Sequence, residues 1–160
     1  MSIPSLSDLC ALWRDTLVAD SAISTYCTGT LGATRKIYLG FDEKNPPKIS
    51  DCPFIVIIPI GTRPGDQEDQ HAWTVGIHVG INDGTFSDYQ SKGATEMRGF
   101  HRVDYLWNLV QDSLGTLSSA KNLATDTIQY QIIMEAFPLV QASGLIEARL
   151  TNTIGINITL

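Results

Sequence analysis

The stretch Phe54-Ile-Val-Ile-Ile-Pro-Ile60 is an unbroken apolar run, and an alternating segment from Trp73 to Ile81 follows it. A continuous apolar run is typical of a strand covered on both faces, whereas strict alternation indicates a strand with one covered face. The polar and acidic segment from Gly61 to His71 connects the two. Together they predict a long β-hairpin with an acidic tip, around which a small domain can be organised. Pro59 predicts an edge position or a bulge near the end of the first strand.

An amphipathic helix is predicted on each side of this hairpin in the chain. Ser5 and Asp8 fit a capping box, and apolar residues then recur at spacings of three and four, so we expect a helix over 6–20. A second stripe, from Val103 to Leu114, predicts a helix over about 100–114, with Gly115 as its carboxyl cap.

Alternating apolar residues predict three further strands. They lie at 37–41, at 128–134 and from Ile146 onward, where every even position except Asn152 is apolar. Residues 21–36 show no clear period, and polar connections are expected at 42–48, 85–99 and 118–127. The sequence therefore predicts one α+β domain over residues 1–160. Its sheet would be mixed and mostly antiparallel, with a long hairpin and two main helices packed on one face.

Composition narrows the classes of partner. The 160 residues carry a net charge of −6 with scattered basic residues, which argues against a protein that tracks nucleic-acid phosphates. No run approaches the roughly 20 apolar residues that span a bilayer. Three widely spaced cysteines and an amino terminus without the features of a secretory signal favour a reduced, cytoplasmic chain. A mean hydropathy of +0.02 is high for a fully wet surface, so part of it is expected to be covered by other subunits.

We find no pattern that carries chemistry, and therefore expect no catalytic residue, cofactor or metal. His71 and His78 have opposite parity on the predicted strand, so one ion cannot bind both. His101 has no histidine or cysteine partner at helical spacing. The segment from Gly61 to Gly65 lacks the Gly-Lys-Ser/Thr ending of a phosphate loop, and no serine lies in a GxSxG setting.

The polar segments are instead candidates for contacts with other proteins. The charged tip is most simply a solvated loop, and its functional interpretation is an electrostatic docking patch, which sets register and association rate. The candidate contact residues in the tip and in the later polar segment are Arg63, Asp66, Glu68, Asp69, His71, Tyr89 and Lys92.

An alternative is a small-molecule binding domain or an enzyme with a pocket between helix and sheet. His101 and Asp104 are three residues apart and could share a helical face in such a pocket.

The order of these segments resembles the small tail-terminator and tail-completion proteins of long-tailed bacteriophages, especially those of Mu-like prophages. The resemblance covers about residues 5–160 and is one of layout. The segments that carry it are Leu6 to Leu17, Phe54 to Ile81 and Tyr105 to Leu117, the last beginning with a YLWNLV pattern.

The resemblance implies a structural protein that forms a ring, usually of six copies, on the head-proximal end of the tail tube. Such a ring ends tube polymerisation and joins the head connector, first in the bacterial cytoplasm during assembly and then in the virion. Six copies at −6 each would carry about −36, which suits a passage for DNA without specific binding. A different neck or baseplate station in the particle would fit the same features.

Overall fold

A computed structural model describes residues 4–63, 71–89 and 92–151. The helices are α1 (Leu6–Ala19), α2 (Ser21–Gly29) and α3 (Arg98–Ala120), with a short 3-10 turn, η1, at Ile49–Asp51. The strands are β1 (Lys36–Leu39), β2 (Phe54–Arg63), β3 (Ala72–Asn82), β4 (Phe86–Tyr89), β5 (Ala94–Met97), β6 (Leu123–Ala136) and β7 (Leu139–Leu150). β1, β2, β3, β7 and β6 form a five-stranded sheet in that order, and β4 and β5 form a separate pair.

The predicted hairpin is at the centre of the sheet. β2 and β3 pair antiparallel, with Phe54 opposite Gly80, and β3 is the middle strand because β7 pairs with its other side. The first four residues of β2 are buried, as the apolar run predicts, because alternate side chains pack on opposite faces. Ile55 and Ile57 pack in the main core, and Phe54 and Val56 pack in a smaller cluster with Leu139. β1 pairs with β2 only as far as Ile57, and the β2–β3 register shifts between Pro59 and Gly61. The proline is thus at a bulge, beyond the residues that β1 covers.

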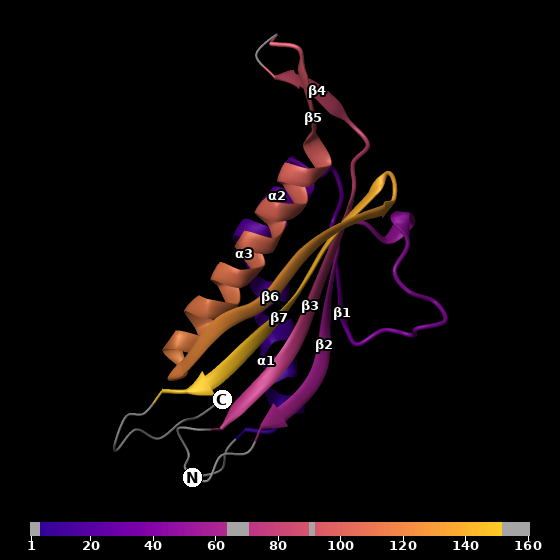
Figure 1. The fold of residues 1–160 in the computed structure, drawn as a ribbon. Helices are drawn as coiled ribbons and strands as arrows, with labels where there is room; N and C mark the ends of the chain where they lie inside the picture. The colour runs from indigo at the N-terminus through magenta and orange to yellow at the C-terminus, as the bar shows by residue number, and fades with distance from the viewer. Residues whose placement is uncertain (1–3, 64–70, 90–91, 152–160) are drawn as a thin grey trace.

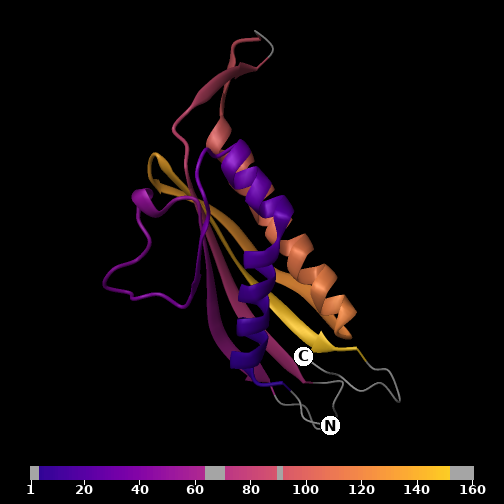
Figure 2. The same ribbon diagram turned by 180° about the vertical axis from the view of Figure 1, so that it is seen from behind.

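The helices and the sheet confirm the predicted α+β class. All the helices lie on one face of the five-stranded sheet, as the two opposite views show (Figure 1, Figure 2). Their apolar stripes pack on the inward side chains of β2, β3 and β7 in one core. Trp13, Trp73 and Trp107 are all buried there, and each indole N–H donates a hydrogen bond within the protein, which removes the cost of burying a polar group.

The first helix follows the prediction closely. The Ser5 hydroxyl accepts from the Asp8 amide at 3.1 Å, and the Asp8 carboxylate accepts from the Ser5 amide at 3.2 Å, so both halves of the capping box are present.

The expected end of the second helix was wrong. α3 continues through Gly115 to Ala120, because Leu114 and Ser118 still face the core and their burial outweighs the low helix propensity of one glycine. The helix is capped instead at Lys121, whose amide donates to the carbonyls of Leu117 and Ser118. Residues 118–127 are therefore not a polar connection, since β6 begins at Leu123.

Two elements were missed in segments taken as irregular. α2 occupies part of 21–36, where the Asp20 carboxylate caps the helix by accepting from the Ile23 amide at 2.9 Å, and Ile23 and Cys27 face the core one turn apart. The other is the β4–β5 hairpin within 85–99, whose strands are largely polar. Both are short, so their sequence patterns are weak.

The two final strands form a second long hairpin. β7 starts earlier than expected, at Leu139, and its even positions from 140 to 150 are buried, which confirms the predicted parity as far as the described residues go. The continuation of the pattern from Asn152 to Leu160 lies outside them. β6 is longer than the predicted 128–134 and forms one edge of the sheet.

Candidate functional site

The predicted contact residues are separated to opposite ends of the molecule. Arg63 ends β2 and His71 precedes β3, so both lie at the end of the sheet where that hairpin turns. Tyr89 and Lys92 belong to the β4–β5 hairpin, hereafter the arm, which projects beyond the other end (Figure 1). β3 alone spans roughly 33 Å between these ends at 3.3 Å per residue. The remaining candidates, Asp66, Glu68 and Asp69, lie outside the described residues.

At the hairpin end, the two described candidates differ in their surroundings. The side chain of Arg63 is 68% exposed and lies 3.7 Å from the Glu147 carboxylate, a surface pair of small energetic weight that leaves the guanidinium available. His71 is half-buried, with its ring edge-on to Trp73 at 4.6 Å, so it contributes shape to this end more than an exposed charge.

The arm consists of two four-residue strands, with Phe86 opposite Met97 and Tyr89 opposite Ala94. Gly93 closes it with a φ of +75°, a conformation that favours glycine, and Lys92 beside it is exposed. A two-stranded hairpin is marginally stable alone in water, so its position depends on what holds its base.

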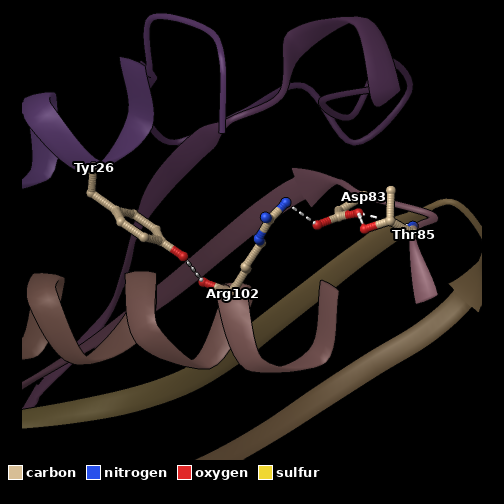
Figure 3. Close-up of polar contacts among 4 residues, drawn as sticks. All are labelled: Tyr26, Asp83, Thr85 and Arg102. Carbon is tan, nitrogen blue, oxygen red and sulfur yellow. Dashed lines mark hydrogen bonds and ion pairs between the residues drawn. The ribbon is translucent and has the colours of Figure 1, made fainter. Parts of the chain in front are cut away.

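A buried carboxylate, Asp83, holds the base of the arm (Figure 3). It is 6% exposed, and its Oδ1 accepts from the Thr85 amide at 2.9 Å and from the Thr85 hydroxyl at 2.6 Å. Its Oδ2 forms an ion pair with Nη1 of Arg102 on α3 at 2.6 Å. Burial alone would raise the pKa of Asp83, but the hydrogen bonds from Thr85 and the Arg102 guanidinium outweigh it, so the pKa lies below its ordinary value. This carboxylate therefore stays ionised. It joins the segment between β3 and β4 to α3, the helix that follows β5.

The cluster extends to α2. The Tyr26 hydroxyl donates to the Arg102 carbonyl at 3.1 Å (Figure 3). The Tyr26 ring also packs on Tyr105, with centroids 4.7 Å apart. Burial raises the pKa of Tyr26 to about 12, so the phenol keeps the proton that it donates. At Gly99 an added Cβ would lie 2.6 Å from the Asp83 carbonyl oxygen, which shows how closely α3 approaches this turn. The sequence analysis did not single out Asp83. The available signal was the Asp-Gly-Thr order, which allows the aspartate to bond two residues ahead.

Exposed aromatic side chains lie beside the base of the arm. Phe86 and Phe137, from the turn between β6 and β7, are 56% and 57% exposed with ring centroids 6.2 Å apart. Aromatic residues at a protein surface are typical of interface centres. This end of the molecule thus combines a projecting hairpin, a rigid base and an exposed apolar pair.

The structure does not bring the side chains of His101 and Asp104 together. His101 is exposed and lies 3.6 Å from Glu96 on the arm, whereas Asp104 accepts from the Tyr130 hydroxyl at 2.6 Å, so the two side chains have different partners. A cavity of about 500 Å³ does lie between α3 and β6, but neither residue lines it.

The described residues offer little else for chemistry. They contain no group of three or more metal-ligating side chains. Burial raises the pKa of each thiol, Cys10, Cys27 and Cys52, to about 11, so all three are poor nucleophiles at neutral pH. No described helix has the length and apolar character needed to cross a membrane.

Comparisons with known proteins give a similar fold. The chain matches no protein-family model and no curated protein sequence. Among solved structures, a chain of the virion of a native gene transfer agent (GTA) particle superposes with a TM-score of 0.58 at 16% sequence identity. The match covers 94% of this chain and 100% of that one. At this identity, the similarity establishes a shared fold.

Proposed function

We propose that this protein is a structural component of a phage-type particle, and specifically a ring-forming tail terminator that caps the tail tube and joins it to the head connector. The observation that carries the proposal is the correspondence, over the whole of the other chain, with a protein of a gene transfer agent virion. A match of that extent means that the arrangement of helices and sheet is shared, with no large part of either chain left over.

The distribution of surface features supports this role. A subunit of a joining ring needs contacts for its neighbours and for a partner above and below it. This protein has exposed features at both ends of its long sheet, namely Arg63 at the hairpin end and the arm with Phe86 at the other. Heterologous contacts between identical copies close into a ring when the rotation permits. We take six copies from the resemblance to tail terminators, with assembly in the bacterial cytoplasm.

Size-exclusion chromatography with light scattering, over a series of rising protein concentrations, tests the proposal. We expect a discrete oligomer and, by negative-stain electron microscopy, rings with a central hole. Native mass spectrometry then gives the copy number. A monomer at every concentration, with no ring in micrographs, would contradict the proposal.

Charge reversal tests the tip of the β2–β3 hairpin as a contact. The tip variant replaces Asp66, Glu68 and Asp69 by lysine, and the control replaces three exposed acids elsewhere: Asp15, Glu43 and Asp112. The tip variant should keep the circular dichroism spectrum and melting temperature of the native protein but lose assembly, while the control should assemble. Unfolding of the tip variant would show that these residues serve the fold instead.

A further inference from the structure

One edge of the sheet has no partner strand among the described residues. β6 pairs with β7 on one side, and no described strand pairs with its other side. Register shifts after Thr127 and after Ile133 leave a regular run, Gln129–Ile133, between two bulges. No charged residue lies between Asp126 and Glu135. An uncharged edge strand presents unpaired backbone groups and invites pairing with another chain, which most proteins prevent with lysine, proline or a covering element.

The sequence also contains a strand pattern without a place in the described sheet. Residues 152–160 lie outside the described part of the chain, and their sequence is Asn-Thr-Ile-Gly-Ile-Asn-Ile-Thr-Leu. Apolar residues occupy every second position from Ile154 to Leu160, and the parity is that of the buried positions of β7. The segment is uncharged and rich in β-branched residues, which is typical of a strand with one covered face.

The end of the sheet sets the distance that this segment would have to cover to reach the edge of β6 in the same chain. Leu150 pairs with Leu123, the first residue of β6, and the last β7 residue that pairs with β3 is Arg149. Thr151 then donates two hydrogen bonds to the Asn122 carbonyl, at 2.9 Å from its amide and 2.8 Å from its hydroxyl. The described chain therefore ends beside the first residue of β6. To reach Gln129 it would have to reverse and travel about six residues, or roughly 20 Å, of the roughly 30 Å that nine residues span.

We propose that residues 152–160 of one copy pair with the outer edge of β6 in a second copy, and that this strand addition closes the ring. The inference rests on the proposed function and adds the contact through which neighbouring subunits join. The contact is heterologous, since an end of one copy meets an edge of the next, and contacts of this kind form rings when the rotation between copies closes. Main-chain hydrogen bonds supply the affinity in strand addition, and alternate side chains supply the register.

The side chains at the edge fit this occupant. Tyr130 and Ile132 lie on the face of β6 that the helices cover, where Tyr130 packs on Trp107 with centroids 4.9 Å apart and Ile132 packs on the core. The alternating apolar residues of an added strand would extend this layer on one face. Because neither segment contains a charged side chain, pairing desolvates no side-chain charge.

The test uses full-length variants and a fluorescent peptide of residues 152–160. The proline variant, Ile156→Pro/Ile158→Pro, removes two backbone hydrogen-bond donors outside the described fold. The valine variant, Ile156→Val/Ile158→Val, is its control because valine keeps the strand pattern. We expect the proline variant to melt like the native protein but to self-associate at least tenfold more weakly, and the valine variant to assemble normally.

Peptide binding then locates the contact. The labelled peptide should bind saturably to the proline variant, measured by fluorescence anisotropy. Gln131→Lys, introduced into that variant, places a charge on the regular edge and should weaken binding at least tenfold, whereas Asn108→Lys on exposed α3 should not.

The outcomes separate this inference from the proposed function. If the native protein forms rings and the proline variant forms them equally well, strand addition is wrong and the ring stands. If the native protein remains a monomer, the proposed function fails. If the peptide binds to the proline variant while the native protein stays a monomer, the segment pairs within its own chain, and the second copy is excluded.

Discussion

Asp83→Ala should loosen the base of the arm and destabilise the protein measurably. The change removes the acceptor of three hydrogen bonds and leaves Arg102 and the Thr85 amide without that partner. Breaking a fully buried ion pair costs about 3–5 kcal/mol. Arg102 is 31% exposed, so water recovers part of this cost, and we expect a loss of about 2–3 kcal/mol. In a domain of this size the melting temperature should fall by roughly 4–12 °C.

Two comparisons isolate the cause. Asp83→Asn keeps an acceptor for Thr85 and removes only the charge that faces Arg102, so it should cost less, about 1–2 kcal/mol. Asp15→Ala removes the carboxylate of an ion pair that is also short, 2.8 Å to Arg14, but exposed, and it should cost less than about 0.5 kcal/mol.

Urea unfolding followed by circular dichroism measures these free energies, and hydrogen exchange over the arm shows where the structure opens. Exchange in residues 86–97 should accelerate in Asp83→Ala more than exchange in β3. A double-mutant cycle with Arg102→Ala should give a coupling energy of at least about 1 kcal/mol. A coupling below about 0.3 kcal/mol would refute the argument that this ion pair anchors the arm.

Three further outcomes follow from the same structure. Folding lowers the pKa of Asp83 below 3.8, so the stability that its carboxylate gives the folded state is complete above about pH 4 and is lost as pH falls through the folded-state pKa. The free energy of unfolding should therefore fall less steeply with decreasing pH in Asp83→Ala than in the native protein. Gly144→Ala places a Cβ 2.5 Å from a β6 carbonyl oxygen and should cost about 1–3 kcal/mol in thermal unfolding, whereas Gly115→Ala, whose nearest neighbour would be 3.5 Å away, should stabilise α3 by about 0.5–1 kcal/mol. Ser118→Ala leaves the Trp13 indole N–H without its acceptor and should lower stability by about 1–3 kcal/mol, seen with a change in tryptophan fluorescence.

The local sequence pattern was sufficient to predict an element where that element buries a long, regular stripe of apolar side chains. The apolar run from Phe54, the alternation from Trp73 and the capping box at Ser5 each state, within a few residues, which side chains can be buried and where a helix begins. The α+β class follows from those elements alone. Pattern failed at Gly115, where a local helix-ending signal is overridden by the burial of Leu114 and Ser118 on either side.

The tertiary structure decided which elements are neighbours, because that depends on contacts between residues far apart in the chain. Periodicity does not state that β7 enters between β3 and β6, nor that β6 is left at an edge. The arm has polar strands that bury little, so its position comes from Asp83 and Arg102, which are 19 residues apart. The same folding separates Arg63 from Lys92. The polar contact candidates, which the sequence offered as one group, therefore lie at two opposite ends of the molecule. The physical reason is that a strand of eleven residues, β3, lies between them.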